Sequence, residues 1–370
     1  MLTTQKIPLL ELRGTPRQCG RIHGETLRSL IAEFLATSYE VHRVNMPMVA
    51  SREALVDFSR RNLGFLRRYS PDLLEEMEGI AEGAGQAFDD ILFLNSFLEL
   101  EDLRAPSLGG KILDGNLWGC TTFNVLPSAS GDGNSYIGQT FDMEQYYTKF
   151  NCLLRIQQGD GLISLVYSLA GILGLNGMNS AGIGMVINKL VANDAREGVI
   201  YPFIIRKSLA QTRVGDAFGA TVFAERASGM NYQIASTDGV AFCIETSATW
   251  YDLLPFEDAI AHTNHYLSPL MRRYETPKWL SHGGSYVRHQ VMSRNLKQEC
   301  GKLVPGKLQE LTQDHTNSPR SICAHGFEGQ DEYNAFGSIS ACVMDLAEQT
   351  LWFSNGNPCC QEYLPYSIRI

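Results

Sequence analysis

The residues best suited to carry out chemistry are Gly119 and Cys120, in the stretch NLWGCTTF at 116–123. A cysteine that directly follows a glycine has two interpretations at this point. Most unpaired cysteines behave as small buried hydrophobic residues, and position alone favours that interpretation. The alternative is a nucleophile that is released when the chain is cut between the two residues, and the other motifs have to decide.

The second interpretation requires a defined series of reactions. The Cys120 thiol attacks the carbonyl carbon of Gly119, the acyl group moves from nitrogen to sulfur, and water then releases it. A glycine leaves the attacked carbonyl least crowded. The product is an N-terminal cysteine whose α-amine has an ordinary pKa of about 7.7–8.0, close to the thiol value of about 8.5. The amine can therefore serve as the base without a histidine.

Other common catalytic motifs are absent from the sequence. We find no GxSxG nucleophile elbow, no Walker loop and no GxGxxG after a strand. His262 and His265, in HTNH at 262–265, could place two metal ligands together, but no clear carboxylate or cysteine set completes such a site. Hydrogen-bonded structural histidines are the commoner outcome. We therefore predict no metal site and treat a metal enzyme as the weakest alternative.

Segments along nearly the whole chain resemble one enzyme family. It comprises the acyl-coenzyme A:6-aminopenicillanic acid acyltransferases and their bacterial relatives, which are N-terminal-nucleophile hydrolases. Each segment alone is a weak match, whereas their order and spacing together are specific. The matching segments are LLELRGTPRQCGRIHGETL near the N-terminus, GCTTF at the cleavage site, GQTFDM at 138–143, GMNSAGIGMVINKL at 177–190, HTNH at 262–265, SYVRHQ at 285–290, SIC at 321–323 and GNPC at 356–359.

The resemblance implies catalytic roles around Cys120. Asp142 would orient the α-amine, and Asn264, with a backbone N–H, would stabilise the tetrahedral oxyanion. Asn188 would position the substrate or the amine. Taken singly, Asp142 is better explained as a turn cap, and the asparagines as satisfied buried amides. Their ordered match with Cys120 favours function.

The resemblance also implies substrate-binding residues near the same site. For Arg288, a solvated charge on a helix is as good an explanation as substrate binding. For Ser285, a substrate-binding role and a role without function are equally well supported. The implied substrate-binding residues are Thr121, Ser285, Arg288, Ala324 and His325.

One position departs from the family pattern. The family usually has SICR, with an arginine that aids the site, whereas this chain has SICAH, with Ala324. A missing cation removes one means of lowering the thiol pKa or of holding an anionic substrate group. Arg320, His325 or Arg288 could replace it. The departure supports an alternative function, in which the fold is retained and binds a ligand with little catalysis.

The leading prediction is a cysteine hydrolase that is activated by self-cleavage. Cys120 would form an acyl-thioester from an amide or thioester substrate and pass the acyl group to water or to an amine. No cofactor is expected, and a coenzyme A thioester is a candidate donor substrate. The expected partners are this small-molecule substrate and the second chain that self-cleavage produces; assembly into a homo-oligomer stays open.

The fold that the resemblance implies is α+β, a four-layer αββα sandwich of stacked antiparallel sheets flanked by helices. Residues 1–119 would form a mostly helical small chain that stays associated with the catalytic part, residues 120–370. The patterning agrees, because residues 7–13 predict a strand and residues 15 to about 103 predict helices. Residues 104–116, rich in glycine and without periodicity, predict an exposed linker.

Beyond Cys120 the sequence predicts hairpins separated by a few helices. Thr15–Pro16 and Ser70–Pro71 earlier mark helix starts. Hairpins, rather than strict strand–helix alternation, argue for antiparallel sheets. The predicted hairpins are CTTFNVLP with SYIGQTF, NCLLRIQQ with LISLVYSL, the two strands of ASTDGVAFCIETSATWYDLL, and SISACVMDLAEQTLWFSNG; GIGMVINKL is a further strand, and helices are predicted near 201–227, 287–296 and 306–313.

Composition limits the class of protein. The 370 residues are 44% hydrophobic and 19% charged, with a net charge of −9, which makes nucleic acid an improbable partner. Nine scattered cysteines without a CxxC pair, and no visible signal peptide, predict a reducing, cytoplasmic setting. The apolar stretch 163–187 contains asparagines, serines and glycines, so we interpret it as strands and turns and predict no association with a membrane.

Overall fold

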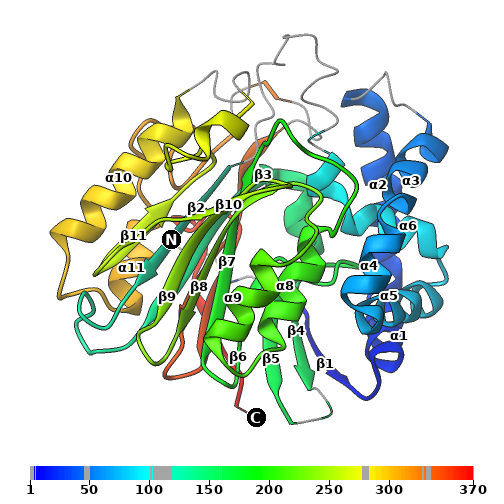
Figure 1. The fold of residues 1–370 in the computed structure, drawn as a ribbon, viewed down its shortest axis with the longest axis horizontal. Helices are drawn as coiled ribbons and strands as arrows, with labels where there is room; N and C mark the ends of the chain where they lie inside the picture. Colours follow the sequence, from blue (N-terminus) through cyan, green and yellow to red (C-terminus); the bar gives the residue numbers. More distant parts are fainter. Residues whose placement is uncertain are drawn as a thin grey trace.

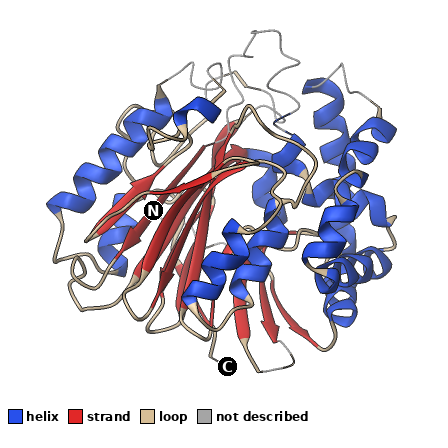
Figure 2. Ribbon diagram, in the orientation of Figure 1, coloured by secondary structure: helices blue, strands red, loops and turns tan. Residues whose placement is uncertain are grey.

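Two β-sheets stacked face to face form the centre of the protein (Figures 1 and 2). The computed structural model describes residues 4, 6–45, 51–100, 102, 119–157, 159, 161–276, 283–326, 329–330 and 335–369. The predicted linker at 104–116 lies outside the described residues. The strands of the first sheet, in spatial order, are β1 (Leu9–Arg13), β4 (Asn151–Gln157), β5 (Ile163–Leu169), β6 (Asn176–Asn179), β7 (Ile183–Leu190), β8 (Gly229–Ser236), β9 (Ala241–Thr246) and β10 (Tyr251–Leu253).

The second sheet carries the Gly119–Cys120 bond at the start of one of its strands. All its pairings are antiparallel, and β2 lies between β11 and β3. Contacts of β2 and β3 with β7 and β8 join the two sheets. In spatial order the strands are β11 (Ala259–His262), β2 (Gly119–Val125), β3 (Tyr136–Glu144), β12 (Phe336–Asp345), β13 (Thr350–Asn355) and β14 (Leu364–Ser367).

Helices cover the outer faces of both sheets, so the layer order is α, β, β, α, as predicted. Helices α10 and α11 lie over the second sheet, whereas α8 and α9 lie over the first, and the N-terminal helices gather near its β1 edge (Figure 1). The helices are α1 (Pro16–Thr26), α2 (Arg28–Asn45), α3 (Arg52–Arg60), α4 (Leu63–Tyr69), α5 (Pro71–Ala84), α6 (Phe88–Asn95), α8 (Tyr201–Leu209), α9 (Val214–Val222), α10 (Gly284–Gln298) and α11 (Pro305–Leu311); the 3-10 helices are η2 (Gln145–Phe150) and η3 (Arg272–Tyr274).

This layering explains the apolar stretch at 163–187. Its strands β5, β6 and β7 have helices on one side and the second sheet on the other, so nearly every side chain is buried. A strand buried on both faces has a continuous apolar run instead of an alternating one. The interpretation as strands is confirmed. Within the described ranges, no helix combines the length and apolar character that a membrane span needs.

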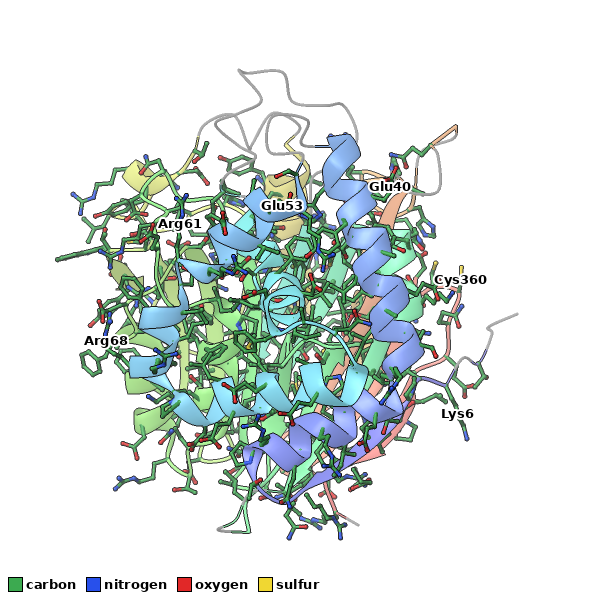
Figure 3. All side chains as sticks on the ribbon, turned by 90° about the vertical axis from the view of Figure 1, so that its right-hand side faces the viewer. Lys6, Glu40, Glu53, Arg61, Arg68 and Cys360 are labelled. Atoms are coloured by element: carbon green, nitrogen blue, oxygen red, sulfur yellow. The ribbon has the colours of Figure 1, made fainter. Side chains whose placement is uncertain are left out.

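The first helix of the N-terminal segment, α1, starts at the predicted residues. Thr15 caps α1 in a capping box with Gln18, and Pro16 occupies the first turn. Ser70 precedes α5 but its side chain makes no capping hydrogen bond, which corrects that detail. On the face shown in Figure 3, exposed charged side chains such as Glu53 and Arg68 point outward from these helices.

The segment before Gly119 shares its core with the rest of the chain. Strand β1 pairs in parallel with β4, and one hydrophobic cluster spans both parts. Two buried ion pairs also connect them. Arg206 contacts Glu76 through both guanidinium nitrogens at 2.7 Å, and the Lys189 ammonium lies 2.8 Å from the Asp102 carboxylate.

Replacing Arg206 by methionine is expected to destabilise the protein by about 3–5 kcal/mol, because Glu76 then keeps an uncompensated buried charge. The double variant Glu76→Leu with Arg206→Met should recover most of this loss. The midpoint of denaturant unfolding measures the effect. Arg17→Met, which removes the exposed pair with Glu82, is the control and should cost less than about 1 kcal/mol. Equal losses for both arginines would contradict the expectation.

Candidate active site

Cys120 is the second residue of β2 and is buried, with 4% of its surface exposed. It lies opposite Phe141 on β3, and the amide side chain of Gln139 on the same strand lies near its thiol and lowers the thiol pKa. Burial raises the pKa of the thiol to about 12, and the nearby Asp142 adds to this, whereas Arg288 opposes it. In the uncut chain the thiol is therefore protonated at neutral pH and needs a base to react.

Arg288 reaches Cys120 from α10, which packs on β2 and β11. Its Nη1 donates to the carbonyl oxygen of Cys120 at 2.6 Å and to the hydroxyl of Thr121 at 3.1 Å. Its Nη2 donates to the Asn264 side-chain oxygen at 2.9 Å. The guanidinium is buried, so its charge acts on the Cys120 peptide with little screening by water.

Asn264 holds the backbone nitrogen of Cys120. Its Oδ1 accepts the N–H of Cys120 at 2.9 Å, while its Nδ2 donates to the carbonyl of Lys189 at 3.2 Å. Ser285 fixes Asn264 in turn, because its hydroxyl accepts the Asn264 backbone N–H at 2.9 Å. Asn264 thus contacts the group that would become the α-amine. Its predicted role as oxyanion donor stays a prediction.

Asn188 approaches Cys120 from the other sheet. Its Nδ2 donates to the Cys120 carbonyl at 3.2 Å, and its Oδ1 accepts from the Thr122 hydroxyl at 2.7 Å and from the Asn231 amide at 2.9 Å. These side chains are fully buried between the sheets. A satisfied polar network in such a place fixes the position of each member.

Asp142 lies directly opposite Gly119 in the β2–β3 ladder. Its Oδ1 accepts from the Ser338 hydroxyl at 2.6 Å, and the Ser338 oxygen accepts the Ala324 backbone N–H at 3.0 Å. Burial raises the pKa of Asp142 to about 7, although Arg288 and the hydrogen bond from Ser338 oppose this effect. The carboxyl group can therefore take up or release a proton near neutrality.

Gly119 has no room for a side chain. A Cβ atom there would lie 2.9 Å from Asp142 Oδ2 and 3.3 Å from Arg288 Nη2. Glycine at this position thus leaves space for the carboxylate as well as keeping the carbonyl uncrowded.

Gly119→Ala is expected to slow any cleavage at this bond by about tenfold to a hundredfold, because the methyl group displaces Asp142 from its position. The rate at which precursor disappears on denaturing gels measures this. Gly215→Ala, at a position where a Cβ meets nothing within 4 Å, is the matched control. Normal processing of Gly119→Ala would show that the close approach of Asp142 does not matter.

Comparison with known proteins places this arrangement in a family. The profile of "Acyl-coenzyme A:6-aminopenicillanic acid acyl-transferase" matches residues 129–359, more than half of the chain. The chain belongs to this family. The match includes the segments that carry Asp142, Asn188, Asn264 and Arg288.

Two curated relatives have names of enzymes that transfer or hydrolyse acyl groups. The chain is 24% identical to the acyl-coenzyme A:6-aminopenicillanic-acid-acyltransferase 40 kDa form of Emericella nidulans, over 88% of this chain and 87% of the relative. It is 27% identical to the β-alanyl-dopamine/carcinine hydrolase of Drosophila melanogaster, over 58% of this chain and 57% of that protein.

Solved structures give a more distant similarity. A conjugated bile acid hydrolase from Clostridium perfringens aligns with a TM-score of 0.41 and 9% identity, over 67% of this chain and 96% of the other. A penicillin V acylase from Agrobacterium tumefaciens aligns with a TM-score of 0.38 and 12% identity, over 64% and 83% of the two chains. Scores this low carry no argument about this site.

Ala324 is the position that departs from the acyltransferase family pattern. It contributes only backbone atoms to the site. The Ala324 side chain is a buried methyl group, and its peptide holds Ser338 through both N–H and C=O. Of the three cations considered as replacements, Arg288 is the one that contacts Cys120. His325 lies apart, beside Cys323 and Cys359. The predicted residues that meet at the Gly119–Cys120 bond are Gly119, Cys120, Thr121, Asp142, Asn188, Asn264 and Arg288, with Ser285 one contact away.

The two histidines of HTNH have structural partners. His262 is fully buried, with one ring nitrogen 2.8 Å from Glu245 Oε1 and the other 2.7 Å from the Thr263 carbonyl. His265 Nδ1 lies 2.7 Å from the Ser285 hydroxyl. Because both nitrogens of His262 are engaged, the pair is not available as a metal site, in agreement with the interpretation as hydrogen-bonded histidines.

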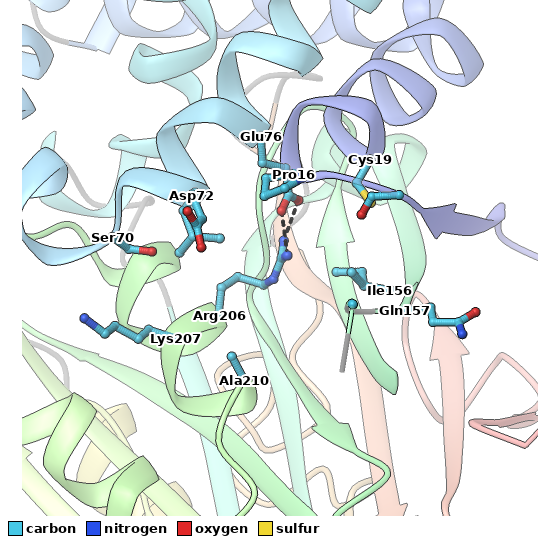
Figure 4. Close-up of a pocket in the computed structure, with 13 residues that line it drawn as sticks. Pro16, Cys19, Ser70, Asp72, Glu76, Ile156, Gln157, Arg206, Lys207 and Ala210 are labelled. Atoms are coloured by element: carbon cyan, nitrogen blue, oxygen red, sulfur yellow. Dashed lines mark hydrogen bonds and ion pairs between the residues drawn. The ribbon is translucent and has the colours of Figure 1, made fainter. Parts of the chain in front are cut away.

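A cavity of about 450 Å³ lies between α1, α5 and α8, away from the residues of the candidate site (Figure 4). The Glu76–Arg206 ion pair and Cys19 line it, and Cys120 does not. We interpret its ion pair as structural, since it connects the N-terminal helices with α8.

Sequence reasoning missed three contributors to the candidate site. Ser338 contacts Asp142 through the tertiary pairing of β12 with β3, which no local motif reveals. Gln139 lies near the thiol because its strand, β3, pairs with β2. Asn231 could have been noticed as a polar residue in the buried strand GMNYQIAS. The Gln139 Nε2 atom is buried and has no hydrogen-bond partner in the described part of the chain, so it is a donor available near the sulfur.

Proposed function

We propose that the protein is an N-terminal-nucleophile enzyme that cuts itself between Gly119 and Cys120 and then transfers or hydrolyses acyl groups through Cys120. The observation that carries this proposal is the set of contacts at one peptide bond. Asn264 holds the Cys120 nitrogen, Arg288 and Asn188 hold its carbonyl oxygen, and Asp142 lies against Gly119. Membership of the acyltransferase family supports it independently.

In the proposed self-cleavage, Asp142 accepts the thiol proton as the Cys120 sulfur attacks the Gly119 carbonyl carbon. The carbon–nitrogen bond breaks and the Cys120 nitrogen takes up a proton, leaving Gly119 as a thioester on the sulfur. Water hydrolyses the thioester to a Gly119 carboxylate and a free thiol. A carboxyl pKa of about 7 suits a group that accepts and returns a proton.

In the proposed turnover, the free α-amine of Cys120 takes the thiol proton and the sulfur attacks the substrate carbonyl. The tetrahedral intermediate releases the protonated amine or thiol of the substrate and leaves an acyl-thioester. Water or an acceptor amine then takes the acyl group and regenerates the thiol. Asn264 Oδ1 orients the α-amine, while Asn264 Nδ2 and Gln139 Nε2 are the side-chain donors proposed for the oxyanion and the sulfur.

Self-cleavage is expected to slow as the pH falls below about 7, because protonated Asp142 can no longer accept the thiol proton. Precursor made by cell-free translation and followed in buffers from acidic to alkaline pH tests this. Asp142→Asn should cleave slowly at every pH and lose this dependence. An unchanged acidic limb in Asp142→Asn would assign the titration to another group.

A panel of N-acyl amides and acyl-coenzyme A thioesters, assayed with and without acceptor amines, tests the proposed activity. Release of the acid alone indicates hydrolysis, and formation of a new amide indicates transfer. A mass increase of one acyl group on the chain that begins with Cys120 would support the thioester. A self-cut protein that is inert to the whole panel would favour the alternative, a binding protein with this fold.

A further inference from the structure

Four side chains with metal-binding atoms meet near the end of β13, outside the candidate active site. His315 follows α11, Cys323 and His325 precede β12, and Cys359 follows β13. Their ligand atoms all lie within 4.8 Å of one another. The exposed Cys360, labelled in Figure 3, is the neighbour of Cys359 and marks this part of the surface.

The separations fit a tetrahedral ion. His325 Nε2 lies 3.5 Å from Cys323 Sγ, 3.4 Å from Cys359 Sγ and 3.1 Å from His315 Nε2. With zinc–sulfur bonds of about 2.3 Å and zinc–nitrogen bonds of about 2.0–2.1 Å, a tetrahedral site has ligand-to-ligand distances of about 3.3–3.8 Å. The three separations from His325 Nε2 are close to these values, and the remaining separations are within 4.8 Å.

Hydrogen bonds alone do not account for this arrangement. His325 Nε2 contacts three atoms, although an imidazole nitrogen offers only one hydrogen or one lone pair. With an ion at the centre, each of the four ligand atoms would have one partner, the ion, toward which its lone pair points. A disulfide is not the alternative here, because all nine cysteines lie in the described ranges and all are free.

The surroundings resemble the outer shell of a metal site. The Asn357 amide donates to the Cys323 sulfur at 3.9 Å and also to the Ala324 carbonyl. The backbone nitrogens of Cys323 and His325 donate to the carbonyls of Asp314 and Pro319 at 3.0 and 2.9 Å. Such contacts orient ligands and support a thiolate. Cys323 is buried and His315 exposed, which leaves a path from solvent.

We propose that His315, Cys323, His325 and Cys359 bind one Zn²⁺ ion in a closed structural site. Two thiolates and two imidazoles select zinc over magnesium or calcium, and four protein ligands leave no position for a substrate. The ion would fix the Cys323–His325 segment. The Ala324 peptide in that segment holds Ser338, and Ser338 holds Asp142, so the site supports the geometry near Gly119. This proposal departs from the prediction of no metal site and does not depend on the proposed function.

Elemental analysis of protein purified without a polyhistidine tag tests the proposal. We expect about one zinc per chain, and absorption typical of tetrahedral thiolate-bound cobalt when Co²⁺ replaces it. Cys323→Ser and His325→Ala should lose most of the zinc. His315→Ala should weaken binding and keep the fold, because His315 is exposed. Cys300→Ser, which changes an exposed cysteine outside the cluster, should keep the full zinc content.

Two results would overturn the proposal. One is wild-type protein that neither contains zinc nor takes up Zn²⁺ or Co²⁺ after reduction of its thiols. The other is a folded Cys323→Ser, Cys359→Ser double variant that still holds one zinc. Both readouts are metal contents, so they are independent of any enzymatic activity.

Discussion

Replacing Cys120 by alanine is expected to leave the protein as one uncut chain and to lower acyl transfer or hydrolysis by at least about 10⁴-fold. The sulfur is the proposed nucleophile for both reactions, and no other group in the candidate site replaces it. Denaturing gels report the cutting, and product formation on the responsive substrates reports the activity.

A matched control separates this result from a simple packing defect. Cys342 is also buried, on β12 of the same sheet, and Cys342→Ala removes a thiol of equal size. Cys342→Ala should cut itself and keep its activity. If Cys120→Ala also kept its activity, Cys120 would be a buried core thiol, as its position alone first suggested.

Replacing Arg288 by leucine is expected to lower self-cleavage and turnover by about 10²-fold or more at neutral pH. The change removes the donor to the Cys120 carbonyl and the one guanidinium that contacts this peptide in the described site. Arg288 lowers the pKa values of Asp142 and of the Cys120 thiol, so both should rise in the variant. The acidic limb of the cleavage–pH profile should therefore shift to higher pH, and alkaline buffer should restore part of the rate.

Two variants on the same helix sharpen this test. Arg288→Lys keeps the charge but loses the two-pronged contact, so its rates should lie between those of wild type and Arg288→Leu. Arg294→Leu removes an exposed charge of α10 and should change little. A loss of rate in Arg288→Leu without a shift in the pH profile would assign Arg288 to packing rather than to electrostatics.

The hairpins were predictable because they depend on residues close in sequence. The pairs β2–β3, β4–β5, β9–β10 and β12–β13 and the strand β7 follow from turn residues and apolar patterning, and all are confirmed. The parallel pairing of β1 with β4 was not predicted, since it joins segments far apart in the chain. The short strands β11 and β14 have too few residues for a pattern.

In the candidate site, too, some features were predictable from the sequence and others were not. The resemblance named Cys120, Asp142, Asn188 and Asn264, and the fold brings them together. The way Arg288 acts depends on how α10 packs over β2, and a single sequence does not show this. The metal-binding cluster is the extreme case, because its ligands come from three segments without a recognisable spacing.

Intact-mass measurement of freshly purified wild-type protein under denaturing conditions tests the proposed self-cleavage most directly. We expect two chains, residues 1–119 and 120–370, whose masses add up to that of the precursor plus one water. Both should elute together under native conditions, held by the shared core and the Arg206–Glu76 pair. A folded, active protein that remains a single chain of 41.1 kDa would contradict the proposal.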